Sequence, residues 1–269
     1  MFDVQQLFHE KYPSFVTKHP WLTRVLVACI RHLWREAECQ RFIQDKANVQ
    51  GVELIKAGFD YLDFDLCLAN GSTLDAIPEN GGFIVVANHP IGSLDGLGLL
   101  KLISAKRPGI KSLSNAMLYT VPHMRGMIFP IDNVARKLSK KTYSNLNRHL
   151  ADGNGLLIFP AGLVSRKRAG RIDDLPWRKG FYQLAKTHNV PIIPMYIDAH
   201  NSWFFYSLSR INFALSTLWL VREMFNFRHQ RVPVYVGQPM DAHESLMADG
   251  VQTVRHAVYA LAPNCRKSV

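Results

Sequence analysis

Residues 83–100 read FIVVANHPIGSLDGLGLL, and this stretch decides the fold. The apolar run at 83–87 predicts a buried strand, and the spacing at 94–105 predicts a helix. His89 and Asp95 therefore fall in the turn between the carboxyl end of a strand and the start of a helix. Because open α/β sheets place ligands at this edge, the turn is a candidate active site. We predict that His89 is a general base and that Asp95 orients it.

The remaining sequence alternates strands with helices. Further strands are predicted at 110–113, 127–131, 156–159, 192–197 and 232–236, and helices at 134–151, 177–188, 203–225 and 245–261. This alternation predicts an α/β fold with a mixed, largely parallel sheet covered by helices.

The N-terminal part of the sequence lacks this alternation. Residues 1 to about 70 read as helical, with one helix starting near Trp21 after Pro20 and another at 52–68. We predict a helical N-terminal extension at 1–75, with possible membrane contact, and a catalytic domain at 76–269. The segments 21–34 and 203–221 are apolar but carry charges, which is typical of amphipathic helices at a membrane surface.

The net charge and the composition restrict the classes of partner that we expect. The 269 residues carry a formal charge of +11, with a pI near 9.6, and the sequence shows no nucleic-acid-binding signature. We therefore expect an anionic membrane surface as a partner and no nucleic acid. Four scattered cysteines indicate reduced thiols rather than a disulfide framework or a metal site. Without a signal-peptide pattern or a transmembrane segment, we expect a peripheral protein on the cytoplasmic face of the inner membrane.

A second block of interest, FPAGLVSR, occupies residues 159–166 and also follows a predicted strand. Gly162 lets backbone N–H groups approach a ligand, and Ser165 and Arg166 offer a hydroxyl and a guanidinium suited to phosphate or carboxylate. A solvated basic loop explains the block equally well. Two weaker blocks lie at 125–136, which ends at Arg136, and at 190–194.

The order of these four blocks resembles the lysophospholipid and glycerol-phosphate acyltransferases of the PlsC-like superfamily. The match is closest to a divergent branch that includes hemolysin-like and lyso-ornithine-lipid acyltransferases. The resemblance covers about residues 80–200. It implies transfer of a fatty acyl group from acyl-CoA or acyl-ACP to a hydroxyl of a lyso-lipid or glycerol-phosphate-like acceptor, with no cofactor and no metal. By this resemblance His89 is the general base, Asp95 its partner, and Gly162, Ser165, Arg166 and Arg136 bind the acceptor.

The chain departs from the family pattern at two places. Five residues separate His89 from Asp95 where the family usually has four, and Ala161 replaces a glutamate. We predict that Gly92 supplies the tight bend that brings Asp95 back to His89. Two alternatives remain open: a non-catalytic lipid-binding or membrane-scaffolding protein on the same fold, and a hydrolase using Ser93 or Ser165, although neither serine lies in a nucleophile elbow.

Overall fold

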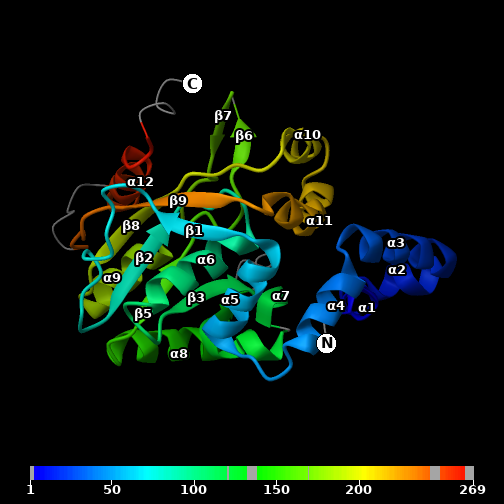
Figure 1. The fold of residues 1–269 in the computed structure, drawn as a ribbon, viewed down its shortest axis with the longest axis horizontal. Coiled ribbons are helices and arrows are strands. Elements are labelled where there is room, and N and C mark those ends of the chain that lie inside the picture. The colour runs from blue at the N-terminus through cyan, green and yellow to red at the C-terminus, as the bar shows by residue number, and fades with distance from the viewer. Residues whose placement is uncertain (1–2, 120, 132–137, 169, 243–248, 264–269) are drawn as a thin grey trace.

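The computed structural model of the protein describes residues 3–119, 121–131, 138–168, 170–242 and 249–263. Its centre is a seven-stranded sheet with the order β1-β9-β8-β2-β5-β3-β4 (Figure 1). The strands are β1 (Asp65–Leu68), β2 (Phe83–Ala87), β3 (Lys111–Asn115), β4 (Ile128–Ile131), β5 (Gly155–Ile158), β8 (Ile192–Ile197) and β9 (Arg231–Val236). All neighbours are parallel except β8 and β9, which confirms the predicted mixed, largely parallel sheet.

Helices cover both faces of the sheet, and β2 is buried on both. Side chains alternate along a strand, so Val85 and Ala87 pack with α5 and α6, whereas Ile84 and Val86 pack with α8, α9 and α12. All five residues of β2 are buried, as a central parallel strand requires. The covering helices are α5 (Gly51–Leu62), α6 (Ser93–Ser104), α8 (Lys140–Ala151), α9 (Gly180–His188) and α12 (Gly250–Ala260).

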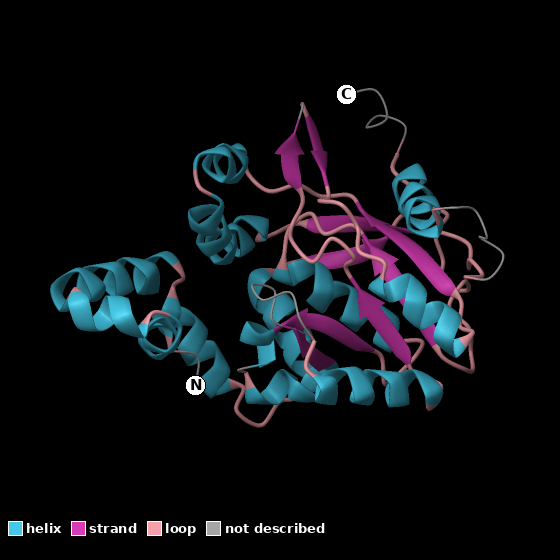
Figure 2. Cartoon of the chain, turned by 180° about the vertical axis from the view of Figure 1, so that it is seen from behind, coloured by secondary structure: helices cyan, strands magenta, loops and turns pink. Residues whose placement is uncertain are grey.

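Four N-terminal helices project from one side of this body (Figures 1 and 2). They are α1 (Val4–Lys11), α2 (Pro13–Lys18), α3 (Pro20–Leu33) and α4 (Glu36–Asp45). They are tied to the body by Trp34, whose indole Nε1–H donates to the carbonyl of Leu218 at 2.7 Å. Among the described residues, no helix has both the length and the apolar character needed to cross a bilayer.

The predicted helix at 52–68 is wrong at its end. Helix α5 stops at Leu62 because Asp63 adopts a left-handed conformation, with φ of 47°. The chain then enters β1, which pairs in parallel with β9 and buries Leu66. The sheet therefore begins within the segment that we expected to be helical.

The predicted helix at 203–225 is two helices, α10 (Trp203–Ile211) and α11 (Phe213–Met224). Asn212 breaks the run because its backbone is extended and its side-chain oxygen accepts the N–H of Leu215 at 3.0 Å, as an N-cap does. The remaining elements are α7 (Ala116–Tyr119), the 3₁₀ helices η1 (Pro122–Met127) and η2 (Phe225–Phe227), and a hairpin of β6 (Arg166–Arg168) and β7 (Arg171–Asp173) that we did not predict.

Other helix boundaries shift by a few residues. The helix expected from 177 begins at Gly180, and α8 begins at Lys140 behind the cap Ser139. Residues 134–137 and 245–248, which we expected to begin two helices, lie outside the described residues.

Candidate active site

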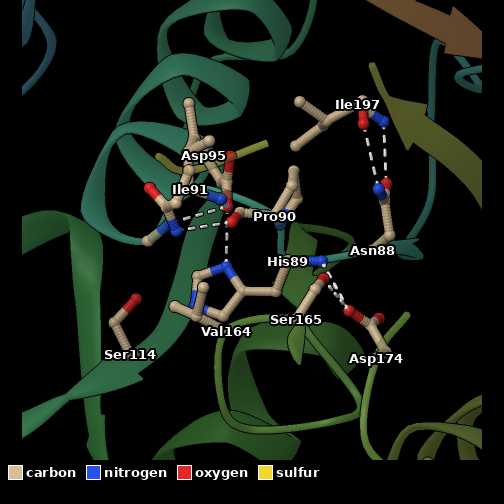
Figure 3. Close-up of polar contacts among 12 residues, drawn as sticks. Asn88, His89, Pro90, Ile91, Asp95, Ser114, Val164, Ser165, Asp174 and Ile197 are labelled. Atoms are coloured by element: carbon tan, nitrogen blue, oxygen red, sulfur yellow. Dashed lines mark hydrogen bonds and ion pairs between the residues drawn. The ribbon is translucent and has the colours of Figure 1, made fainter. Parts of the chain in front are cut away.

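The histidine turn leaves the carboxyl end of β2 and is fixed by the residue before it. The side chain of Asn88 donates to the carbonyl of Ile197 at 2.9 Å and accepts the N–H of Ile197 at 2.7 Å. This two-bond exchange ties the start of the turn to the end of β8. His89 therefore projects from a rigid point of the sheet (Figure 3).

His89 and Asp95 meet despite the five residues between them. Nδ1 of His89 lies 2.9 Å from Oδ2 of Asp95. The same oxygen accepts the backbone N–H groups of Ile91 and Gly92, each at 2.9 Å. Asp95 stands in the first turn of α6, where a carboxylate is stabilised by the free N–H groups of the helix. Three donors thus converge on one oxygen (Figure 3).

The backbone bend at Gly92 accommodates the additional residue between His89 and Asp95. Its φ of 95° and ψ of −129° lie outside the conformations that other residues adopt at low cost. This bend turns the chain so that α6 begins at Ser93 and Asp95 faces back to His89, as the sequence predicted for Gly92.

Substituting Gly92 with alanine is therefore expected to destabilise the protein by about 1–2 kcal/mol and to lower activity together with stability. A built Cβ would meet only Val164 and Leu220, at 3.6 and 3.9 Å, so the cost comes from the backbone rather than from a clash. Chemical denaturation measures the first effect, and an assay of the acyl transfer that the resemblance implies measures the second. Gly81→Ala is the matched control, because Gly81 has φ of 78° with no atom within 4 Å of a built Cβ, and it lies at the amino end of β2, opposite the end that leads into the histidine turn. Equal activity losses in the two variants would contradict a specific role of the Gly92 bend.

The environment of the pair suits proton transfer. Asp95 is fully buried, and this burial raises the pKa of its carboxyl, while the hydrogen bonds from His89 and the backbone act in the opposite direction. The imidazole stacks on the ring of Phe159, with ring centroids 4.3 Å apart, and its side chain is 18% exposed. Because Nδ1 faces the carboxylate, Nε2 is the nitrogen that can take a proton from a substrate hydroxyl.

The block at 159–166 lies directly beside the histidine turn, as its position after β5 predicted. The backbone N–H of Ser165 donates to the carbonyl of His89 at 2.8 Å. Gly162 makes the tight turn with φ of 67°, and its N–H donates to the carbonyl of Phe159 at 2.9 Å. The Ser165 hydroxyl is buried and donates to Asp174 at 2.5 Å, an arrangement that does not favour a nucleophile.

Arg166 is buried rather than exposed on a basic loop. Its guanidinium lies between the rings of Phe205 and Phe213, at 4.7 and 4.8 Å from their centroids. Burial lowers the pKa of Arg166 to about 10, so it still carries its charge at neutral pH. It donates to the carbonyl of Val164 at 3.1 Å, and no carboxylate among the described residues pairs with it. A buried cation of this kind can receive an anionic ligand.

Sequence reasoning missed three residues of this site. Asp174 follows the unpredicted hairpin, Asn201 donates its side-chain amide to the carbonyl of Pro90 at 2.9 Å, and Phe159 provides the stacking surface for the imidazole. Only Phe159 stood in a block that we singled out. Arg136, the remaining predicted site residue, lies outside the described residues. Within the described part of the chain, no cluster of three or more His, Cys, Asp or Glu side chains could hold a metal ion.

Known proteins are similar to this chain in sequence and in fold. A family model described as "Acyltransferase" matches residues 6–265. A lyso-glycine lipid O-acyltransferase of Phocaeicola vulgatus is 27% identical to this chain, over 97% of this chain and 95% of that protein. A protein of the same name from Bacteroides thetaiotaomicron is 26% identical, over 89% and 88%. The crystal structure of the 1-acyl-sn-glycerophosphate acyltransferase PlsC from Thermotoga maritima has the same fold, with a TM-score of 0.50, 17% identity and coverage of 96% and 92%.

Proposed function

The chain belongs to this acyltransferase family, within the PlsC-like superfamily, and on that premise we propose that it moves a fatty acyl group from acyl-CoA or acyl-ACP to the hydroxyl of a lyso-lipid. One observation carries the mechanism: Nδ1 of His89 lies 2.9 Å from the buried carboxylate of Asp95, at the carboxyl end of β2. His89 is the general base, and Asp95 fixes its tautomer and stabilises the imidazolium.

The proposed reaction needs one proton carrier. Nε2 of His89 takes the proton of the acceptor hydroxyl as the hydroxyl oxygen attacks the thioester carbonyl. The tetrahedral intermediate collapses, the C–S bond breaks, and the imidazolium returns the proton to the departing thiolate. The acyl group thus passes directly to the acceptor without a covalent acyl-enzyme, and the residues of the chain supply the proton transfer without a cofactor.

The proposed acceptor follows from the positive charge of Arg166 in the block at 159–166. Arg166, a buried cation with no carboxylate partner among the described residues, supports an acceptor with an anionic head group. The two similar bacterial proteins are named for lyso-glycine lipids, and glycine joined through its amine retains a carboxylate. We therefore favour a lyso-lipid with an amino-acid head group and a free carboxylate. Gly162, Ser165 and Arg166 are proposed to contact it, together with Arg136.

An assay of purified enzyme with paired donors and acceptors tests this proposal. Acyl-CoA and acyl-ACP are each offered with lyso-lipids that carry a carboxylate, a phosphate or a neutral head group. Transfer to the carboxylate acceptor that exceeds transfer to the neutral one supports the assignment. A protein that binds these lipids but turns over no donor would instead be the non-catalytic scaffold. The longer His–Asp spacing does not favour that alternative, since the two side chains are still in contact.

A membrane partner is supported by exposed apolar side chains on α10 and on the N-terminal helix α3. Trp203 and Ile211 on α10 are 77% and 84% exposed, and Trp21 on α3 is 73% exposed. The α10–α11 pair is close to the histidine turn, because a Cβ on Gly92 would lie 3.9 Å from Leu220. Exposed tryptophan beside basic residues is typical of helices that lie in the membrane interface. We propose peripheral binding to an anionic bilayer on the cytoplasmic face of the inner membrane, with helices α1–α4 of the proposed N-terminal extension at 1–75 and the α10–α11 pair as the contact surface.

Replacing Trp203 and Ile211 together with glutamate is expected to weaken binding to vesicles containing anionic lipid by at least about 10-fold, because two large apolar side chains no longer enter the interface. Co-sedimentation measures the partition. Tyr143→Glu on α8 is the matched control, since its side chain is 51% exposed on a helix outside the proposed surface. Unchanged partition of the double variant would place the membrane contact elsewhere.

A further inference from the structure

The carboxylate of Asp174 joins the histidine turn to the block at 159–166, although it belongs to neither. It is 6% exposed and follows directly after β7. Its Oδ1 accepts the hydroxyl of Ser165 at 2.5 Å and the backbone N–H of His89 at 3.2 Å (Figure 3). One oxygen thus contacts the main chain of the general base and the side chain of the second block.

These contacts close a ring of hydrogen bonds around the histidine backbone. The N–H of His89 donates to Asp174, and the carbonyl of His89 accepts the N–H of Ser165 at 2.8 Å. Ser165 completes the ring through its own bond to Asp174. The backbone N–H of His89 is therefore held by Asp174 and its carbonyl by Ser165, whereas its imidazole is held by Asp95.

Asp174 is itself anchored away from the site. Its other oxygen, Oδ2, accepts the indole Nε1–H of Trp177 at 3.0 Å. Its backbone N–H donates to the hydroxyl of Tyr259 at 3.0 Å, and Arg255 donates to its carbonyl at 3.3 Å. Both of these partners lie on α12. The carboxylate is thus fixed from outside the site and has the rigidity that a positioning group requires.

We propose that Asp174 is a positioning residue for acyl transfer, which holds the His89 backbone against the Ser165 loop so that the base faces the acceptor. The inference rests on the proposed function, since it gives His89 the role of general base. Asp174 acts through His89 and Ser165, and the block that it fixes is the one proposed to bind the acceptor.

The three hydrogen-bond donors around Asp174 predict that an amide cannot replace it. A carboxylate accepts at both oxygens, and Asp174 receives three donors, from Ser165, His89 and Trp177. An asparagine offers one acceptor oxygen. Its NH₂ group would therefore face either the indole N–H of Trp177 or the two donors from Ser165 and His89. Asp174→Asn therefore breaks the ring or the anchor while preserving volume.

The experiment compares Asp174→Asn with Leu146→Ala. Leu146 lies on α8, is fully buried in the core and takes no part in the ring of hydrogen bonds or in its anchor, so Leu146→Ala destabilises the fold without touching either. For folded Asp174→Asn we expect kcat to fall by roughly 10- to 100-fold, with little change in donor KM. Leu146→Ala should keep kcat within about 3-fold, since it lowers stability without releasing the backbone of the base.

A spectroscopic readout separates positioning from general destabilisation. In protein labelled with ¹⁵N-histidine, the imidazole resonances of His89 are assigned by their absence in His89→Gln. We expect them to shift in Asp174→Asn and to keep their wild-type positions in Leu146→Ala, both recorded well below the melting temperature. Unchanged resonances and full kcat in folded Asp174→Asn, or equal losses in the two variants, would overturn the inference.

The failure of the inference is distinguishable from failure of the proposed function. If the wild-type enzyme transfers acyl groups and His89→Gln does not, the proposed function stands whatever Asp174→Asn does. If the wild type turns over no donor, or if His89→Gln keeps full activity, the proposed function fails first.

Discussion

Replacing His89 with alanine is expected to lower kcat by up to roughly 10⁴-fold, because the acceptor hydroxyl then loses its proton to water instead of to a positioned base. Donor and acceptor KM should change little, since the imidazole acts in the transition state rather than in binding. Initial rates of acyl transfer with saturating donor give kcat, and circular dichroism confirms that the variant is folded.

The surface offers a matched control for this substitution. Nδ1 of His229 also lies 2.9 Å from a carboxylate oxygen, that of Asp63, but its side chain is 78% exposed and lies outside the site. His229→Ala removes the same kind of contact and should retain full activity. If His89→Ala retained wild-type kcat, the general-base assignment would be wrong.

Asp95→Asn is expected to reduce kcat by roughly 10³- to 10⁴-fold, by analogy with the loss of the orienting carboxylate in a serine-protease triad. The amide cannot stabilise the imidazolium, and its NH₂ group favours the wrong tautomer of His89. Asp63→Asn, which removes the carboxylate of the surface His–Asp pair, should leave kcat unchanged. Retained kcat in folded Asp95→Asn would remove Asp95 from the mechanism.

The same variant has an expected effect on the pH dependence of stability. Burial raises the pKa of Asp95 in the folded state, so the folded protein binds this proton more tightly than the unfolded chain does. The contribution of Asp95 to the free energy of unfolding is therefore fully present below the unfolded pKa. It is lost as the pH rises through the higher, folded-state pKa.

Urea denaturation of wild type and Asp95→Asn at several pH values measures this contribution. Asp174 also has a raised pKa, but both proteins contain it, so the difference between them isolates Asp95. The stability of the wild type relative to Asp95→Asn should decrease as the pH rises from 4 towards neutrality, a window set by the unfolded pKa of about 4 and the raised folded value. If the relative stability instead increased over this window, the hydrogen bonds rather than burial would determine the direction in which the pKa of Asp95 is shifted.

Much of the sheet was predictable because apolar strands are visible in a single sequence. The run at 83–87 and the run at 192–197 match β2 and β8 residue for residue. The histidine turn followed from its position after β2, and Gly92 was the residue expected to bend the chain. These features depend on local sequence alone.

The missed features depend on contacts between distant residues. The strand at 65–68 looks like the continuation of a helix, and only its pairing with β9 makes it a strand. Asp174 stands 85 residues from His89, so no local pattern connects them. Asn212 was readable as a helix cap, but its apolar neighbours on both sides favoured one long helix. The proposed division of the chain at residue 75 stays a prediction.

The hairpin of β6 and β7 projects from the body between Ser165 and Asp174 (Figure 1). The hydroxyl of Ser165 donates to Oδ1 of Asp174 at 2.5 Å, so the chain segments that enter and leave the hairpin lie side by side. The bond between Ser165 and Asp174 therefore closes the base of the hairpin, and this bond does not involve the residues at its tip. An inserted peptide or reporter tag after Gly170 would lengthen the tip without moving either end. The tip of this hairpin is therefore a suitable insertion site within a few residues of the proposed active site.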